Sequence, residues 1–207
     1  MATKPILFII AGPQSSGKTT ILQHLKKKFP LFLFINETNQ YSLLNKNHLG
    51  GAFVTREIEE QIVKADIKKV EEIDRSLKHI VIETGIMHCA YLEVFMSKKD
   101  ARSYFHKYIQ AHKGLHPILI FIDTKPQVSW NRRRRIYIER IIQAGVIDSS
   151  KKKEMLAKYQ GNIEKLYPLW IKYFHKVSFE KYMIKNSNKT WNVFEKEIIN
   201  RIKTHID

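Results

Sequence analysis

The chain of 207 residues contains little cysteine, proline or glycine, with one, six and eight of each. A single cysteine, Cys89, excludes an internal disulfide and any zinc site built from several cysteines. This cysteine usage favours a reducing, cytoplasmic setting. Internal repeats, low-complexity tracts and linkers rich in glycine, proline or serine are also absent. The chain is therefore expected to form one domain over residues 1–207.

Long hydrophobic runs are missing as well. The first apolar run, Ile6–Ile10, is too short to span a bilayer, and no small-residue cleavage site follows it. We therefore expect a soluble protein without a membrane partner. Hydrophobic residues nevertheless make up 43% of the chain, which is enough to bury a sizeable core.

Acidic residues are scarce relative to basic ones. The 36 lysines and arginines exceed the 20 acidic residues, which gives a net charge of +16. Such a charge favours anionic ligands, because it raises their encounter rate and local concentration. Nucleic acid, ATP and phosphorylated metabolites all fit this description, and a highly basic proteome would give the same number. The charge alone therefore does not choose among these partners.

Apolar runs alternate with segments of helical spacing. Unalternating apolar runs are typical of strands that are buried on both faces. We expect strands at Ile6–Ile10, Leu31–Ile35, His79–Ile82, Pro117–Ile122 and Tyr182–Ile184. Helical patterns cover Thr20–Lys28, Val54–Leu77, Ile86–Met96, Ala101–His112, Pro126–Ala144, the stretch from Ser149 or Ser150 to His175, and Thr190–Ile206. This order predicts a three-layer α/β domain around a parallel sheet.

Three helix features follow from single residues. Asp100 is a candidate N-cap for the helix that follows it, and Ser149 or Ser150 for the long helix near the C-terminus. Within that long helix, Pro168 predicts a kink.

The strongest motif is the P-loop Gly12-Pro13-Gln14-Ser15-Ser16-Gly17-Lys18-Thr19, followed by Thr20. It lies between a predicted strand and a predicted helix, which is the context that this motif requires. Glycines allow the backbone to turn N–H groups toward one anion, and the helix N-terminus adds positive charge. We therefore expect Gly12, Gln14, Ser15, Ser16, Gly17, Lys18, Thr19 and Thr20 to bind the phosphates of ATP. Lys18 would reach the β- and γ-phosphates, and the Thr19 hydroxyl would bind Mg²⁺.

Two carboxylates follow predicted strands. Glu83 ends the strand at residues 79–82, at the edge where open α/β sheets bind ligands. We expect it to support Mg²⁺ through water. Glu37 follows the second predicted strand, where it would orient an acceptor hydroxyl or take its proton.

An arginine-rich helix follows Asp123 and Pro126. Like charges three or four residues apart repel each other, unless a polyanion lies between them. Arg132, Arg135 and Arg140 are therefore candidates for contact with a phosphoryl group, although a solvated basic face is an open alternative. We assign catalytic roles to Lys18, Glu37, Arg132 and Arg135.

With these motifs the chain resembles the P-loop nucleoside and nucleotide kinases, which include thymidylate kinase and the deoxynucleoside kinases. The matching segments are Ile82-Glu83-Thr84, the series Asp123, Pro126 and Arg132, and Ile184-Lys185-Asn186-Ser187, with Glu37 at the position of a catalytic glutamate. The resemblance implies a five-stranded sheet of order 2-3-1-4-5 and a helical lid over about residues 126–160. It also implies that Asn186 lies near the adenine.

Two positions depart from the family pattern. Thr84 stands where the family has an arginine after the strand-three acid, and Thr38 stands where a proline follows the strand-two glutamate. A standard thymidylate kinase is therefore not expected. Arg56 is the candidate replacement for the missing arginine, facing the acceptor.

These observations lead to three hypotheses. The first is an ATP- and Mg²⁺-dependent kinase that phosphorylates a nucleoside, a nucleotide or a related small metabolite. The second is a kinase of nucleic-acid 5′-hydroxyl ends, which the charge of +16 motivates. The third is a nucleotide-gated regulatory protein without catalysis, which Thr84 motivates. The sequence is also compatible with a dimer.

Overall fold

The computed structural model describes residues 4–37, 49–83, 88–187 and 189–206. Their strands are β1 (Ile6–Ala11), β2 (Leu33–Ile35), β3 (His79–Glu83), β4 (His116–Asp123) and β5 (Glu180–Lys185). All neighbouring strands are parallel, in the order β2-β3-β1-β4-β5. The predicted sheet order is therefore confirmed.

Helices connect these strands. They are α1 (Lys18–Lys28), α2 (Arg56–Glu71), α3 (His88–Phe95), α4 (Lys98–Ala111), α5 (Pro126–Gln143), α6 (Ser149–Lys176) and α7 (Trp191–Lys203), with a short 3₁₀ helix at Gly51–Phe53. Within the described ranges, no helix combines the length and the apolar character that crossing a membrane requires.

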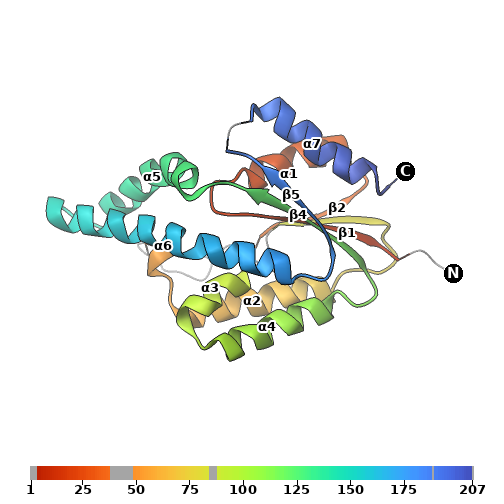
Figure 1. Ribbon diagram of the computed structural model, residues 1–207, viewed down its shortest axis with the longest axis horizontal. Coiled ribbons are helices and arrows are strands. Elements are labelled where there is room, and N and C mark those ends of the chain that lie inside the picture. Colours follow the sequence, from red (N-terminus) through yellow and green to blue (C-terminus); the bar gives the residue numbers. More distant parts are fainter. Residues whose placement is uncertain (1–3, 38–48, 84–87, 188, 207) are drawn as a thin grey trace.

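Helices cover both faces of the sheet. Figure 1 shows α1 and α7 on one face, and α2, α3, α4 and α6 on the other. Alternate residues of the central strand β1 serve the two layers: Phe8 and Ile10 pack toward α1 and α7, whereas Leu7 and Ile9 pack toward the opposite helices. A third cluster joins α5 to α6, where Tyr137 stacks on Tyr159. The fold is thus the expected three-layer α/β arrangement.

The functional candidates meet at the carboxyl edge of the sheet. The P-loop follows β1, Glu37 follows β2, and Glu83 is the last residue of β3. Helix α5 follows β4, and Asn186 follows β5. Because parallel strands all end at the same edge, residues distant in sequence are brought to one crevice.

Two predicted helix caps are wrong by a few residues. Ser97, not Asp100, caps α4, because Ser97 has extended backbone angles and its side chain accepts a hydrogen bond from the Asp100 N–H at 3.2 Å. Asp148, not Ser149 or Ser150, caps α6, and its carboxylate accepts from the Lys151 N–H at 2.6 Å. The helix continues through Pro168 to Lys176.

Two predicted elements are shorter in the structure. Helix α2 ends at Glu71 rather than continuing to Leu77, because Asp74 accepts hydrogen bonds from the N–H and hydroxyl of Ser76 in a turn. Strand β2 begins at Leu33 rather than at Leu31, whose side chain is exposed. As an edge strand, β2 pairs only with β3.

Candidate active site

A cavity of about 740 Å³ opens at the carboxyl edge of the sheet. The P-loop and α1 form one side, and the segment after β2 together with α2 and α3 forms the other. Glu83 lies between them, while Arg133 of α5 and Trp170 of α6 complete the wall. The cavity therefore has a phosphate side and an opposite side that could receive a second substrate.

Backbone geometry prepares the P-loop for an anion. Gly12 has φ +152°, and a Cβ at this position would lie 2.6 Å from the carbonyl oxygen of Ile122. Ser15 has φ +57° and is the single non-glycine residue with positive φ among those that the structure describes. Gly17 caps α1 without a side-chain hydrogen bond, so the first N–H groups of the helix are not bonded by a cap. Ser16 Oγ is buried and has no hydrogen-bond partner in the described part of the chain.

Lys18 lies over this loop. Its buried ammonium donates hydrogen bonds to the carbonyl oxygens of Gly12 and Pro13, each at 3.2 Å. These contacts keep a positive charge beside the N-terminus of α1, where phosphate groups bind in such loops.

The Thr19 hydroxyl donates a 2.8 Å hydrogen bond to the carboxylate of Glu83. Burial raises the pKa of Glu83, while Lys18 and the Thr19 hydroxyl favour its ionised form. A hydroxyl and a carboxylate are the oxygen donors that Mg²⁺ uses together with substrate phosphates. Among the described residues, no group of three or more His, Cys, Asp or Glu side chains could hold a metal without such phosphates. The chemistry of this pair fits Mg²⁺.

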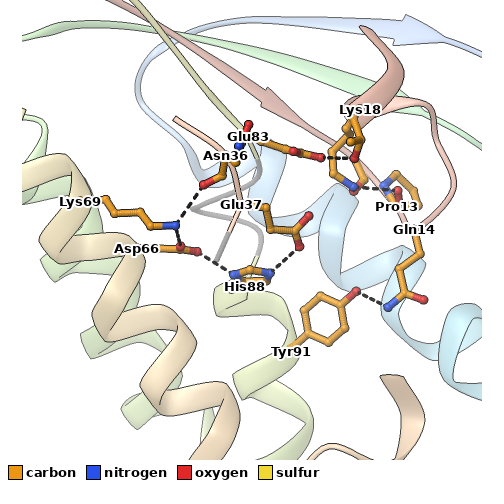
Figure 2. A network of polar contacts seen from close by, with 12 residues as sticks. Pro13, Gln14, Lys18, Asn36, Glu37, Asp66, Lys69, Glu83, His88 and Tyr91 are labelled. Carbon is orange, nitrogen blue, oxygen red and sulfur yellow. Dashed lines mark hydrogen bonds and ion pairs between the residues drawn. The ribbon is translucent and has the colours of Figure 1, made fainter. Parts of the chain in front are cut away.

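On the opposite side, His88 bridges two carboxylates (Figure 2). Its Nδ1 lies 2.7 Å from Asp66 Oδ2, and its Nε2 lies 3.2 Å from Glu37 Oε1. The side chains of Asp66 and His88 are almost completely buried, whereas that of Glu37 is 36% exposed. Glu37 is thus the member of the chain of contacts that reaches the open part of the cavity.

Lys69 continues this chain of contacts. Its ammonium lies 3.8 Å from Asp66 Oδ1 and donates a 3.0 Å hydrogen bond to the carbonyl oxygen of Asn36. Helix α2 is therefore attached to the residue that immediately precedes Glu37.

The two carboxylates control the charge of His88. Burial alone would lower its pKa, but Asp66 and then Glu37 outweigh this effect and raise the pKa to about 10. His88 is consequently an imidazolium at neutral pH, and both of its ring nitrogens donate hydrogen bonds.

A further carboxylate, Glu59 of α2, lines the cavity and is only 3% exposed. Burial raises its pKa to about 7, and the nearby carboxylates of Glu37 and Asp66 add to this effect against His88. Tyr91 and Trp170 lie on the same side, with their ring centroids 5.8 Å apart. The Tyr91 hydroxyl accepts a 3.3 Å hydrogen bond from the Gln14 side chain, which connects this side to the P-loop.

Helix α5 is attached to the P-loop backbone. Ser129 Oγ donates to the Gln14 carbonyl oxygen at 2.7 Å, and Tyr137 donates to the Gln14 side chain at 2.5 Å. Arg132 donates to the carbonyl oxygens of Ser15 at 3.2 Å and Asn186 at 3.1 Å. These contacts place the arginine-rich helix directly against the phosphate cradle.

The predicted P-loop residues all line the cavity: Gly12, Gln14, Ser15, Ser16, Gly17, Lys18, Thr19 and Thr20. Glu37 and Glu83 line it too. Asn186 lies behind the loop, where its side chain donates a 2.7 Å hydrogen bond to the Ser16 carbonyl oxygen. It therefore supports the shape of the P-loop, and its predicted contact with adenine stays a prediction.

Two predicted arginines lie elsewhere. Arg135 is 90% exposed and pairs with Glu139, while Arg133, which was not predicted, lines the cavity. Arg56 is half exposed and pairs with Glu60, and it does not line the cavity, so the structure does not bring it to the predicted acceptor position. Thr38 and Thr84 lie outside the described residues.

Three cavity-side residues escaped the sequence reasoning: Glu59, Asp66 and His88. A signal was nevertheless present, because Glu59, Ile62 and Asp66 follow one another at helical spacing on the apolar face of α2. Acidic residues on a buried stripe are rare unless they are paired or functional. No comparable signal pointed to His88.

Comparison with solved structures extends the assignment of the fold. A deoxyadenosine kinase from M. mycoides with bound dATP matches 96% of this chain and 100% of its own length, with a TM-score of 0.66 and 14% identity. A thymidylate kinase from Candida albicans matches 99% of this chain and 94% of its own, with a TM-score of 0.59 and 14% identity.

The YorR protein of Bacillus subtilis, solved in complex with phosphorylated GDP, also matches, over 96% of both chains with a TM-score of 0.57 and 14% identity. At this identity the likeness establishes the fold, which is that of the P-loop nucleoside and nucleotide kinases. No protein-family model and no curated protein sequence matches the chain.

Proposed function

We propose that the protein is a kinase that transfers the γ-phosphoryl group of ATP to a hydroxyl group of a nucleoside, a nucleotide or a related small metabolite. The main support is the arrangement of the cavity: the Thr19–Glu83 pair ends the phosphate cradle, and Glu37 lies across the same cavity. Solved proteins with this fold are described as deoxyadenosine and thymidylate kinases, which agrees with the proposal.

On the donor side, N–H groups of the P-loop bind the phosphates of ATP, and Lys18 reaches between the β- and γ-phosphates. Thr19 and Glu83 are the residues that would hold Mg²⁺, Glu83 through water. When bound there, Mg²⁺ supplies charge neutralisation on the phosphate oxygens. The contribution of the chain is to fix these donors before the substrate arrives, so that little reorganisation is needed during transfer.

On the acceptor side, Glu37 accepts a hydrogen bond from the reacting hydroxyl and orients its oxygen toward the γ-phosphorus. The acceptor oxygen bonds to the γ-phosphorus while the bond between that phosphorus and the β,γ-bridging oxygen breaks, so that ADP leaves. The proton of the hydroxyl passes to Glu37. His88 donates to Glu37 Oε1 at 3.2 Å. The imidazolium therefore positions the carboxylate that receives the acceptor.

Residues 126–160 form the lid in this proposal. Arg132 contacts the carbonyl oxygen of Ser15 within the cradle, and Arg133 lines the cavity. A guanidinium in either place matches the charge that develops on a transferring phosphoryl group. Arg135 stays a candidate only if the helix rotates or moves, because its side chain is directed to solvent.

The decisive experiment is transfer from γ-labelled ATP and Mg²⁺ to a panel of nucleosides, nucleoside monophosphates and a short RNA with a 5′-hydroxyl end. Label in one acceptor class, absent with Lys18→Ala, would support the proposal. Binding of ATP without transfer to any acceptor, and with hydrolysis at the background rate, would refute it in favour of a nucleotide-gated regulatory protein.

A second enzymatic function is motivated by the net charge of +16, namely phosphorylation of nucleic-acid 5′-hydroxyl ends. Several phosphates of a strand would have to contact lysines and arginines, so affinity would fall steeply with salt. Label entering the RNA alone, with a strong salt dependence, would favour this function over the first.

A further inference from the structure

The carboxylate of Glu59 is buried, in a place where charge is costly. Its side chain is 3% exposed, and Oε2 has no hydrogen-bond partner among the described residues. The indole N–H of Trp170, on the same wall of the cavity, is also buried and lacks a partner within those residues. A buried hydrogen-bond acceptor and a buried hydrogen-bond donor therefore line one cavity but do not bond to each other.

Buried polar groups without hydrogen-bond partners lower the stability of a folded protein. An unpaired buried polar group costs about 1–3 kcal/mol, and a charged one costs more. His88 favours the charged form of Glu59 but does not bond to it, because both ring nitrogens of His88 are already bonded to Asp66 and Glu37. A ligand that donates a hydrogen bond to Glu59 would remove this cost on binding.

The charges around Glu59 indicate what kind of ligand can do so. Glu37, Asp66 and Glu59 lie together. The cations that contact these carboxylates are His88, bonded to Asp66 and Glu37, and Lys69, which lies 3.8 Å from Asp66. Of the other basic groups on the wall, Lys18 belongs to the P-loop, Lys26 donates to Asn36 Oδ1 at 3.3 Å, and Arg133 comes from α5, which is attached to the P-loop. Arg56 lies outside the cavity wall and is paired with Glu60. A phosphate group beside Glu59 would therefore face the carboxylates of Glu59, Glu37 and Asp66.

Building on the kinase function proposed above, we infer that Glu59 is a specificity-determining residue. It accepts a hydrogen bond from the molecule that is phosphorylated, at a group other than the reacting hydroxyl, and this molecule is uncharged. The reacting hydroxyl lies at Glu37, and a further hydroxyl or amino group of the same molecule lies at Glu59. Ile62 and the ring of Trp170 provide apolar surface for the rest of the acceptor. An unphosphorylated nucleoside fits this chemistry, and a nucleoside monophosphate does not.

The test measures equilibrium binding and transfer side by side. Purine and pyrimidine nucleosides and their 5′-monophosphates are titrated by calorimetry into the full chain, saturated with Mg²⁺ and an ATP analogue whose γ-phosphate cannot be transferred. The variant is Glu59→Gln, and the matched control is Glu57→Gln, an exposed acid two residues away on the same helix. Because binding needs no transfer, the result does not depend on the kinase activity itself.

We expect at least one nucleoside to bind at least tenfold more tightly than its monophosphate. Loss of a hydrogen bond to a charged group predicts that Glu59→Gln weakens nucleoside binding by about 10- to 100-fold. Glu57→Gln should leave it unchanged, and the melting temperature of Glu59→Gln at pH 8 should be no lower than that of the wild type. Equal or tighter binding of monophosphates, no nucleoside binding, or full affinity in Glu59→Gln would each overturn the inference. Binding without transfer would refute only the kinase proposal.

Discussion

The phosphate side of the cavity is one continuous stretch of chain, whereas the acceptor side is assembled from three separate segments. Residues 12–20 form the cradle. Ser129 and Arg132 bond its backbone to α5, and Asn186 bonds it to the end of β5. The acceptor side brings together Glu37 after β2, Glu59 and Asp66 on α2, and His88 on α3.

The two sides also differ in the kind of polar group that they present. The cradle offers hydrogen-bond donors and the ammonium of Lys18, as an anion requires. The acceptor side offers carboxylate oxygens, with His88 tethering two of them. A donor side that attracts phosphate and an acceptor side that repels it would direct the two substrates into opposite halves of the cavity.

The largest effect is expected from the phosphate side. Lys18→Ala removes a positioned cation from the transferring group and should lower kcat by about 10³-fold or more. The control Lys27→Ala lies on the same helix, exposed and away from the cavity wall, and should retain full turnover. Steady-state kinetics and melting curves of both variants decide the matter. A Lys18→Ala protein with wild-type turnover would contradict the assigned role of the P-loop.

Substitutions on the acceptor side should lower the stability of the fold more than substitutions on the phosphate side. His88→Ala removes the buried partner that lies 2.7 Å from Asp66 Oδ2 and leaves the more distant Lys69, which should cost about 3–5 kcal/mol of unfolding free energy. With a folded pKa of about 10, above its ordinary value of 6.5, His88 stabilises the fold fully below pH 6.5. This contribution is lost as pH rises through about 10.

Urea unfolding at pH 6.5 and pH 10 tests this, with the exposed His106→Ala as the control. Nearly equal stabilities of the two variants at pH 6.5 would show that the bridge to Asp66 contributes little.

Glu59 should give a dependence on pH of the same sign, but in a lower pH window. Its folded pKa of about 7 exceeds the ordinary 4.5, so the folded chain retains a proton that the unfolded chain has released. Stability therefore falls as pH rises from 4.5 to 7, by about 3 kcal/mol at most from this group. Urea unfolding at several pH values gives the free energy of unfolding of the wild type and of Glu59→Gln. The difference between the two isolates this contribution. A flat difference across this window would mean that Glu59 titrates normally.

The smallest difference in kcat is expected between two residues of the arginine-rich helix α5. Arg133→Ala should lower kcat by about 10- to 100-fold, because its side chain lines the cavity. Arg135→Ala should change kcat by less than about twofold, because an exposed pair such as Arg135–Glu139 contributes little. Parallel kinetics of the two variants rank the residues, and a reversed order would mean that α5 turns a different face to the substrate during transfer.

The difference between the two sides also explains what the sequence could predict. The P-loop was recognisable because its residues are adjacent, and each has a local reason for its place between a strand and a helix. The positions of Glu83 and Glu37 at strand ends followed from the same alternation of elements. The resemblance to kinases added the strand order, which the structure confirms, and the lid.

The acceptor side could not be predicted in this way. Whether His88 contacts Asp66 depends on how α3 packs against α2, over 22 positions of sequence separation. Choosing Arg132 and Arg135 but not Arg133 required the rotation of α5 about its axis, which spacing alone does not fix. Arg56 was a reasonable substitute for the missing family arginine, yet a neighbouring acid one turn away, Glu60, pairs with it first.

The attachment of α5 to the P-loop links two events that are usually considered apart. Ser129, Arg132 and Tyr137 bond to Gln14, Ser15 and Asn186, so the helix and the phosphate cradle share one set of contacts. Each of these hydrogen bonds contributes about 0.5–1.5 kcal/mol. In the proposed kinase, moving α5 away would therefore loosen the loop that binds the nucleotide, and a tightly bound nucleotide would favour the attached position of α5. Opening of the proposed lid and release of the nucleotide would then be coupled steps.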